Sequence, residues 1–413
     1  MNSKTISMPA YVEDHATFLD DEASPASVAH RPFSTFNKKP IDATAQPMFF
    51  GENVNVARFD RRKYEIFEKL SEKQLSYFWR PEEVDVSGDR NDFAELNAHE
   101  QHIFISNLKY QILLDSVQGR SPTTAFLPVC SLPELENWFE TWAFSETIHS
   151  RSYTHIVRNV FNDPSAVLDE IMVTPEIIKR ASVVTEEYDR FIELTNIYSV
   201  VGAFGHHTVG DVTYDCTEWN MKYRLARAMV SVYALEAIRF YVSFACSFAF
   251  AERGVMEGNA KIIKLICRDE LLHKTGTKHI LNLLIGTREN DPVMQEIFET
   301  HQEEFKQILV DCKDQESEWI DYLFKDGSMI GLNARILNEY LEWITDEASD
   351  NLGWGVIVGE LKSNPLPWMR SWVTSDAVQP APQETELSSY LVGQIDSSVD
   401  VEELGDFDGD FDF

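Results

Sequence analysis

Arg268-Asp-Glu-Leu-Leu-His273 is the stretch that decides how this 413-residue chain can fold. It places Glu270 three residues before His273, and Glu146-Thr-Ile-His149 repeats that spacing earlier in the chain. On a helix, residues three apart point the same way, so each pair can offer one carboxylate oxygen and one imidazole nitrogen to a metal ion. One such pair alone is weak evidence, because about one is expected by chance among eleven histidines.

Each of the two pairs has an acid upstream in an apolar stretch. Asp115 lies 31 residues before Glu146, and Glu236 lies 34 residues before Glu270. Both separations suit the middle of one long helix facing the middle of its antiparallel neighbour. Four helices that project four carboxylates and two histidines inward carry the ligand set of a ferritin-like di-metal bundle, and we expect an all-α fold of that kind.

Large apolar residues accompany these acids. Phe240 and Phe244 follow Glu236 by four and eight residues, and Ile266 precedes Glu270 by one helical turn. A carboxylate buried on such a stripe is destabilised by the loss of water or takes up a proton, and metal coordination removes that cost. The alternative is that the acids are buried and hydrogen-bonded without a metal. Carboxylate-rich ligation without thiolate favours iron or manganese, and two bridged ions can act jointly on dioxygen.

Tyr153 shares a helix face with the first pair, since it follows His149 by four residues and Glu146 by seven. A phenol beside an oxygen-activating centre can lose one electron. The resulting radical survives only where water and reductants are excluded, and the apolar residues at positions 240, 244 and 266 are candidates to line such a pocket. The alternative is a core tyrosine whose hydroxyl bonds a carboxylate.

Three further residues attract attention. Asp269, next to Glu270, is either an acceptor for the N–H of a ligand imidazole or an ordinary helix acid. Trp79 is by default a packing aromatic at a helix end. Tyr390 lies in an acidic tail where it can bury nothing within its own chain, so we expect it to become ordered on a partner.

Composition excludes several classes of protein. Gly and Pro number 18 and 16, which is low for a loop-rich or many-stranded chain and favours helix. With 36 basic against 68 acidic residues, no stretch offers a basic face to nucleic acid. Five cysteines without C-x-x-C spacing fit a reducing cytoplasm. No signal peptide is evident, and the longest uncharged apolar run, residues 240–251, is too short to cross a membrane.

The chain divides into three parts. Residues 1–46 lack sustained periodicity and are expected to be a flexible leader, whereas residues 47–376 carry helical patterns and form the folded domain. A hairpin is expected around Thr208-Val-Gly-Asp-Val-Thr213. Residues 377–413 form an acidic tail expected to be disordered, with eleven acids between positions 376 and 412 and no basic residue after Arg370. No phosphate-binding glycine motif occurs.

Longer motifs identify a family. The chain resembles the small (β) subunit of class I ribonucleotide reductase, most closely the bacterial class Ia form, over roughly residues 47 to 404. The stretches that carry the resemblance are Pro47-Met-Phe-Phe-Gly, Phe78-Trp-Arg-Pro-Glu-Glu-Val-Asp85, Trp142-Ala-Phe-Ser-Glu-Thr-Ile-His-Ser-Arg-Ser-Tyr153, Glu236-Ala-Ile-Arg-Phe-Tyr-Val-Ser-Phe244, Arg268-Asp-Glu-Leu-Leu-His273 and Ser389-Tyr-Leu-Val-Gly-Gln-Ile-Asp396.

The resemblance implies a set of roles. The ligands of two iron ions per chain, with manganese not excluded, would be Asp115, Glu146, His149, Glu236, Glu270 and His273. Tyr153 would hold a stable radical, Trp79, His149 and Asp269 would form the inner part of a proton-coupled electron path, and Tyr390 would pass the radical to the large (α) subunit. The family also implies a homodimer, a tail that docks on α, and an electron donor for cluster assembly. Neither nucleic acid nor membrane is an expected partner.

Two features depart from the family, and two other functions share the ligand pattern. The leader of about 46 residues has no counterpart in short family members, and the terminal Gly405-Asp-Phe-Asp-Gly-Asp-Phe-Asp-Phe413 is unusually acidic and aromatic. A di-iron oxygenase or desaturase has the same bundle but needs an open substrate cavity. An iron-storage protein forms a multi-subunit shell from shorter chains. The tyrosines at positions 153 and 390 favour the radical-generating function.

Overall fold

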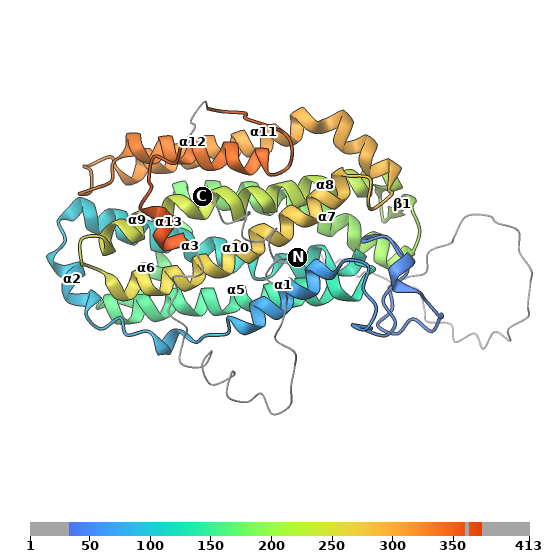
Figure 1. The fold of residues 1–413 in the computed structure, drawn as a ribbon, viewed down its shortest axis with the longest axis horizontal. Coiled ribbons are helices and arrows are strands. Elements are labelled where there is room, and N and C mark those ends of the chain that lie inside the picture. The colour runs from blue at the N-terminus through green and yellow to red at the C-terminus, as the bar shows by residue number, and fades with distance from the viewer. Residues whose placement is uncertain (1–32, 360–362, 374–413) are drawn as a thin grey trace, which may run out of the picture.

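The computed structural model describes residues 33–359 and 363–373, and nearly all of their regular structure is helical (Figure 1). The tail with Tyr390 and the first 32 residues lie outside this range, so the proposed leader and tail boundaries stay predictions. The elements in chain order are η1 (Ala43–Ala45), α1 (Glu65–Ser76), η2 (Pro81–Glu83), α2 (Asp89–Glu95), α3 (Ala98–Gln118), α4 (Ser121–Ala125), η3 (Leu127–Val129), α5 (Pro133–Val160), α6 (Pro164–Asp169), η4 (Ile171–Val173), α7 (Pro175–Val201), β1 (Gly205–Val209), β2 (Val212–Cys216), α8 (Glu218–Ala234), η5 (Leu235–Arg239), α9 (Phe240–Ala251), α10 (Glu257–Ile285), α11 (Pro292–Leu323), α12 (Ala334–Asp350) and α13 (Met369–Val373).

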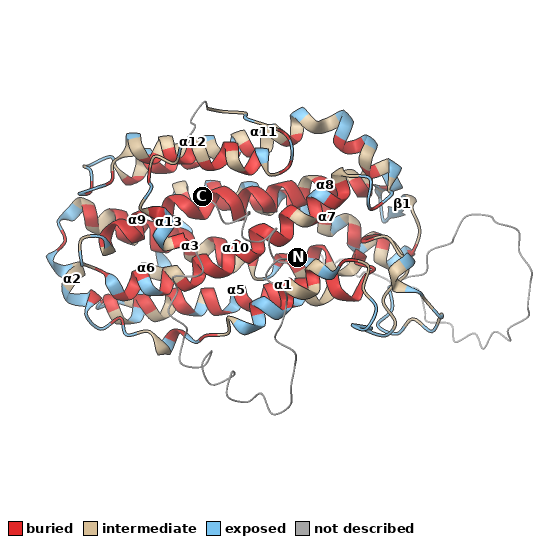
Figure 2. Ribbon diagram, in the orientation of Figure 1, coloured by how far each residue is buried: buried red, intermediate tan, exposed pale blue. Residues whose placement is uncertain are grey.

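Four long rods form the centre of the molecule. They are α3, α5, α10 and the continuous rod made by α8, η5 and α9. Helix α3 packs against α5 and α9, while α10 packs against α5, η5 and α9. Helices α11 and α12 cover one side of this bundle and α1 covers α5 (Figure 1). The buried residues follow the inner faces of the rods (Figure 2), so the all-α bundle predicted from spacing is confirmed.

Local sequence signals explain where the rods begin and end. The Asn97 side chain accepts a hydrogen bond from the Glu100 backbone at the start of α3, and the Asp291 side chain does the same for Met294 at the start of α11. Pro133 occupies the first turn of α5, where its missing N–H costs nothing. Gly202, with φ of 72°, ends α7 in the left-handed conformation that glycine adopts most easily.

The hairpin expected near residue 210 is present. Strands β1 and β2 pair antiparallel, with Thr208 opposite Thr213 and Val209 opposite Val212. Gly210, with φ of 61°, sits in the two-residue turn between them. The hairpin lies at one end of the bundle in Figure 1, beyond α7 and α8.

Two glycines let the rods approach closely beside the predicted ligands. A Cβ added at Gly276, one turn after His273, would lie 2.6 Å from Nε1 of Trp138. A Cβ added at Gly119 would lie 3.3 Å from Cβ of Glu146. Glycine at these positions therefore brings α10 and α3 against α5 at the level where the ligands lie.

The rod around Glu236 holds one feature that helical periodicity did not predict. Leu235–Arg239 forms a π turn, which winds more widely than the α-helix on either side. The α-helical spacing assumed between Glu236 and Phe240 is therefore interrupted, although both side chains are fully buried. The whole rod, Glu218–Ala251, is long and apolar enough to cross a membrane by composition, but 94% of its most apolar window is buried inside the molecule, as in a core helix.

Candidate metal centre

Six side chains converge in the middle of the bundle. Asp115 comes from α3, Glu236 from the π turn, and the two Glu/His pairs from α5 and α10. All six have an exposed fraction of 0%. Four separate rods therefore place four carboxylates and two imidazoles in one solvent-free interior, as the spacing argument predicted.

The six side chains divide into two overlapping groups of four. Asp115 and His149 join Glu146 and Glu270 in one group, and Glu236 and His273 join the same two glutamates in the other. Within each group, one ligand atom from every residue lies within 4.8 Å of the others. Glu146 and Glu270 belong to both groups, so they are placed to bridge two ions.

The two imidazoles face the shared glutamates through their Nδ1 atoms. His149 Nδ1 lies 3.2 Å from Glu146 Oε2 and 3.1 Å from Glu270 Oε1. His273 Nδ1 lies 3.1 Å from Glu146 Oε1 and 2.8 Å from Glu270 Oε2. Each bridging carboxylate thus turns one oxygen toward each histidine, which gives the site an approximate two-fold arrangement.

Unpartnered oxygens test whether this donor set fits metal ions. Both carboxylate oxygens of Asp115 and Oε2 of Glu236 are buried without a hydrogen-bond partner among the described residues. Burial, followed by the charges of Glu146 and Glu270, raises the pKa of Asp115 and that of Glu236 well above their ordinary values. Such groups are costly in an apolar interior. Two divalent cations would cancel the formal charge of four carboxylates and occupy the free oxygens, so the residues fit a pair of metal ions.

The histidines respond to the same charges in the opposite direction. Burial alone would lower the pKa of His273, but Glu270 and Glu146 outweigh it and raise that pKa to about 9. Burial also lowers the pKa of His149. Hydrogen bonds to Asp269, Glu146 and Glu270 outweigh burial and raise this pKa well above its ordinary value. The same four carboxylates that favour a positive charge on these rings would favour metal cations between them.

Asp269 links the site to Trp79. Its Oδ2 lies 3.2 Å from Nε2 of His149 and accepts a 2.9 Å hydrogen bond from Nε1 of Trp79. Trp79 and Asp269 are each 1% exposed. The sequence singled out all three residues, and the structure joins them in one line from His149 to the segment between α1 and η2.

Three side chains that bond the candidate ligands, directly or through a neighbour, were not singled out from the sequence. Nε2 of Gln118 donates to Oε1 of Glu236 at 2.7 Å, and Oη of Tyr188 donates to Oε1 of Gln118 at 2.9 Å. Nε1 of Trp142 donates to Oε1 of Glu146 at 2.9 Å. Gln118 follows Asp115 by three residues, so its helix face was a signal that it also points inward. Nothing in the sequence marks Tyr188, which reaches the site from α7.

Tyr153 is fully buried, and its Oη has no hydrogen-bond partner among the described residues. Burial and the charge of Asp115 raise its pKa well above the ordinary value, so the phenol is protonated. Phe240, Phe244 and Ile266 are also fully buried, and the two phenylalanine rings lie 5.8 Å apart at 12°. Full burial shields the candidate radical residue from water.

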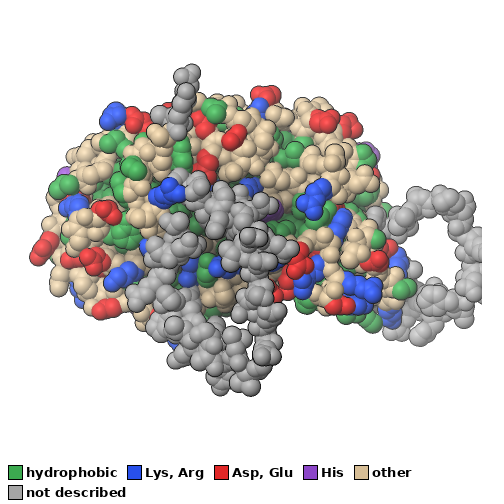
Figure 3. Space-filling model, viewed as in Figure 1, with side chains coloured by type: hydrophobic (Ala, Val, Ile, Leu, Met, Phe, Trp, Pro, Cys, Tyr) green, Lys and Arg blue, Asp and Glu red, His purple; other side chains and the backbone are tan. Residues whose placement is uncertain are grey.

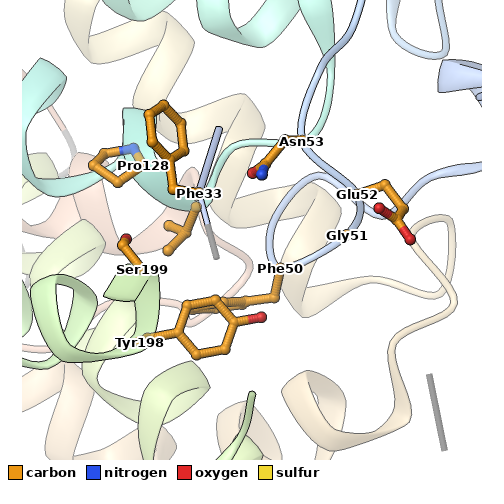
Figure 4. A pocket seen from close by; sticks show the side chains of 9 residues that line it. Phe33, Phe50, Gly51, Glu52, Asn53, Pro128, Tyr198 and Ser199 are labelled. Carbon is orange, nitrogen blue, oxygen red and sulfur yellow. The ribbon is translucent and has the colours of Figure 1, made fainter. Parts of the chain in front are cut away.

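Two pockets lie near this region. One next to Asp269 and Ser145 has a volume of about 20 Å³, which holds about one water molecule. The other, beside the π turn and lined by Ala234, Arg239 and Cys312, has a volume of about 100 Å³. A further pocket of about 20 Å³ lies at the end of the bundle between Phe33, Phe50 and Tyr198 (Figure 4).

On the face shown in Figure 3, Lys and Arg lie interspersed with Asp and Glu.

Comparison with known proteins identifies relatives over most of the chain. The family model described as "Ribonucleotide reductase, small chain" matches residues 57–365. The chain is 58% identical to ribonucleoside-diphosphate reductase 1 subunit beta of an Escherichia coli strain over 375 residues, covering 91% of this chain and 99% of the relative. The corresponding subunit of phage T4 is 42% identical over 377 residues, covering 89% of this chain and 97% of that protein.

Solved structures show the same fold. The ribonucleotide reductase R2 subunit from Clostridium botulinum superposes with a TM-score of 0.71 at 23% identity, covering 84% of this chain and 100% of that one. A dimanganese(II) protein from Streptococcus sanguinis gives a TM-score of 0.61 at 19% identity, covering 78% of this chain and 100% of that one. At these identities, the likeness supports the fold and carries no conclusion about which metal this chain binds.

Proposed function

The chain belongs to the ribonucleotide reductase small-chain family, and from this premise we propose that it is the beta subunit of a ribonucleoside-diphosphate reductase. In this role it holds two iron ions, uses dioxygen to generate a tyrosyl radical, and passes the oxidising equivalent to the large subunit that reduces ribonucleotides. The observation that carries the proposal is the pair of four-residue groups sharing Glu146 and Glu270. A site with two shared carboxylates is built for two ions rather than one.

The protein's own residues set the conditions for the chemistry. Bound as two ferrous ions, the metal supplies two of the four electrons that reduce dioxygen to the level of water, together with the power to oxidise a buried tyrosine. Tyr153 supplies the third electron, and its exposed fraction of 0% protects the radical from reductants. The fourth electron has to come from an external donor. Asp115, Glu146, His149, Glu236, Glu270 and His273 are the ligands we propose.

The path toward the large subunit begins at His149. Asp269 accepts from Trp79 and lies within hydrogen-bonding distance of His149, so an electron leaving Trp79 can be accompanied by proton movement along this line. We propose that Tyr390 of this chain, in the acidic tail outside the described residues, passes the radical across to the large subunit. The same tail provides the docking segment.

We propose a homodimer that uses the face formed by α1 and α5. Leu75 and Phe144 are 55% and 52% exposed there, and the Phe78 ring stacks on Phe144 at 6.1 Å and 17°. Neighbouring exposed apolar side chains of this size mark interaction surfaces, and the commonest arrangement is a two-fold one. We place the protein in the cytoplasm, where its five buried, unpaired cysteines stay reduced.

The competing functions meet specific difficulties. A di-iron oxygenase needs room for an organic substrate near the ions, whereas the pocket beside Asp269 holds about one water in its roughly 20 Å³. Iron storage needs a large shell built from short chains, whereas this chain has 413 residues and an acidic tail. The radical-generating function requires neither a substrate cavity nor a multi-subunit shell.

The decisive test is to load the metal-free protein anaerobically with ferrous ion and then admit air. Optical and electron paramagnetic resonance spectra recorded together should show a di-iron cluster and a tyrosyl radical. The Tyr153→Phe variant should bind the same amount of iron and give no such radical. A full tyrosyl signal in that variant would refute the assignment of Tyr153, and substrate-dependent oxygen uptake without the large subunit would favour an oxygenase.

A further inference from the structure

The end of the bundle that carries the hairpin presents exposed apolar side chains. Phe33 and Phe36 are 51% and 61% exposed, and Val56 and Val200 are 59% and 75% exposed. The backbone N–H of Phe33 donates to the carbonyl of Ser199 at 2.9 Å, which places the N-terminal stretch against the last turn of α7 (Figure 4). We call the surface formed by residues 33–42, 53–61 and 199–201 the end surface.

Two stretches of chain lie side by side on the end surface. Nδ2 of Asn37 donates to the carbonyl of Asn53 at 3.1 Å, and Nδ2 of Asn55 donates to the carbonyl of Lys39 at 2.7 Å. Because both partners advance by two residues, the two stretches run in the same direction. Residues 33–42 and 53–61 therefore form one continuous patch.

The end surface is basic, although the chain as a whole is acidic. Residues 33–63 contain six basic and three acidic residues, whereas residues 64–373 contain 28 basic and 49 acidic ones. Lys38 and Arg61 are exposed, and no hydrogen bond or ion pair joins either of them to another described residue. Two such cations beside exposed apolar side chains fit a ligand that is both acidic and apolar.

The terminal sequence Asp406-Phe-Asp-Gly-Asp-Phe-Asp-Phe413 has this composition. Acids occupy positions 406, 408, 410 and 412, and phenylalanines occupy positions 407, 411 and 413. In an extended backbone, successive side chains point to opposite sides, so this alternation separates the aspartates from the phenylalanines. The acidic stretch Phe18-Leu-Asp-Asp-Glu22 near the N-terminus lacks such alternation.

The terminal sequence is long enough to reach the end surface. Asp406 follows Val373, the last described residue, by 33 positions. An extended chain spans about 3.3 Å per residue, so this length covers up to about 110 Å. Helix α11, with 32 residues, is only about 48 Å long at about 1.5 Å per residue. The length of the tail therefore does not restrict where on the molecule its end can dock.

We propose that the terminal sequence Asp406–Phe413 docks on the end surface of its own chain. Its aspartates lie beside Lys38 and Arg61. Its phenylalanines pack against Phe36 and Val56, because exposed ion pairs contribute little by themselves. Tethering gives the terminal sequence a local concentration on the order of 1 mM, so an untethered dissociation constant of about 0.1 mM keeps the docked form in roughly tenfold excess.

Docking on the end surface competes with docking on the large subunit. This competition rests on the proposed function, whereas the docking itself does not. A docked form in roughly tenfold excess lowers the apparent affinity of the tail for the large subunit by about the same factor. The large subunit then has to displace the terminal sequence before the tail binds.

Cross-linking tests the docking on the full chain without metal and without the large subunit. A carbodiimide joins lysine amines to nearby carboxylates, and mass spectra of the digested protein should contain peptides that link Lys38 to Asp406–Asp412. Lys179 is the control, because its side chain is 59% exposed but lies 21 residues before Val200 on α7, about 32 Å along the helix.

The links to Lys179 should be about tenfold rarer than those to Lys38. Salt at about 1 M shortens the screening length to about 3 Å and should reduce the links to Lys38 to the level of the control. Equal linking at the two lysines would overturn the proposal. Links from Lys38 to Asp20–Glu22 in place of the terminal sequence would overturn it as well.

The affinity for the large subunit tests the competition. The double variant Lys38→Glu with Arg61→Glu should bind the large subunit up to about tenfold more tightly than the native chain. Lys179→Glu with Arg335→Glu changes the net charge equally at exposed positions on α7 and α12, and should leave the affinity unchanged. Equal affinities of the native chain and the first variant would overturn the competition. If no variant binds the large subunit, the proposed function is refuted, and the cross-links alone decide the docking.

Discussion

Asp115→Asn should stabilise the metal-free protein and destabilise the metal-loaded one. Both oxygens of Asp115 are buried without a hydrogen-bond partner among the described residues, and Glu146 and Glu270 repel its charge. In the absence of metal, this carboxylate is therefore a cost to the fold. Asparagine keeps the shape and removes the titrating carboxyl group, but it also removes a candidate metal ligand, so the two states should respond with opposite signs.

The magnitudes follow from the burial of Asp115. Leaving a buried neutral polar group unsatisfied costs about 1–3 kcal/mol, and an ionisable one costs more. Asparagine removes only this excess, so the metal-free variant should gain on the order of 1 kcal/mol in free energy of unfolding. Free metal at 100 times its dissociation constant stabilises the native chain by about 2.7 kcal/mol. If losing a ligand weakens metal binding roughly 100-fold, the same metal concentration only half-fills the variant's site. The metal then stabilises the variant by only about 0.4 kcal/mol.

The pH dependence has a definite sign. The pKa of Asp115 is raised in the folded state above its ordinary value of 3.8. Between pH 3.8 and the raised pKa, the folded protein therefore holds a proton that the unfolded chain has released. The contribution of Asp115 to the free energy of unfolding is fully present below pH 3.8 and is lost as the pH rises through the folded pKa. Asp115→Asn should flatten this decline in the metal-free protein, because asparagine does not titrate.

Urea unfolding followed by circular dichroism, with a chelator or with Mn²⁺, measures both states without oxidation. Asp346→Asn is the matched control, since Asp346 is also a buried acid, 7% exposed, but accepts from the backbone of Ile357, Val358 and Gly359 at 2.8 to 2.9 Å. It should lose about 1–3 kcal/mol with or without metal. If Asp115→Asn behaves like this control, Asp115 is an ordinary hydrogen-bonded acid and the reasoning about the site is wrong.

Three further predictions concern separate parts of the molecule. Gly276→Ala should lower stability by about 1 kcal/mol and weaken metal binding, because the new Cβ would lie 2.6 Å from the buried Trp138 ring and overpacking outweighs the better helix propensity of alanine; calorimetry with Mn²⁺ checks both. Phe144→Glu should convert the dimer to a monomer in analytical ultracentrifugation while the helical signal is kept, and a persistent dimer would place the interface elsewhere. Trp79→Phe should form the Tyr153 radical normally yet lose nucleotide reduction with the large subunit, because Asp269 then has no indole donor; full turnover would exclude Trp79 from the path.

The sequence was sufficient to select the six side chains that converge in the bundle, because their placement depends on regular helix geometry. Residues three apart on a helix point the same way, so Glu146 with His149 and Glu270 with His273 had to act as pairs. Burial of Asp115 followed from its apolar neighbours. These inferences need only the period of a helix and the antiparallel arrangement of neighbouring helices, and both hold in the structure.

Contacts between rods could not be predicted in this way. The bond from Gln118 to Glu236 joins α3 to the π turn, and the bond from Tyr188 to Gln118 adds α7, so both depend on the rotation and offset of rods that sequence spacing does not determine. The sharing of Glu146 and Glu270 by both groups of ligands has the same origin. The ring contact between Tyr110 on α3 and Trp319 on α11 likewise joins two rods that are distant in sequence.

The π turn at Leu235–Arg239 gives the candidate ligand Glu236 a different setting from the two shared glutamates. A π turn holds one more residue per turn than the flanking α-helix, and such turns often occur at functional sites. Glu236 thus leaves the line that an α-helix would impose, and only one of its oxygens is fixed, by Gln118. Glu146 and Glu270, by contrast, sit on unbroken helices and face both histidines. We infer that Glu146 and Glu270 would hold both ions, whereas the Glu236 side chain, with one oxygen free, would be held less firmly than these two. Gln118→Ala should therefore alter the spectrum of the assembled cluster while leaving the amount of bound iron unchanged, and an unchanged spectrum would show that the Gln118 bond does not constrain Glu236.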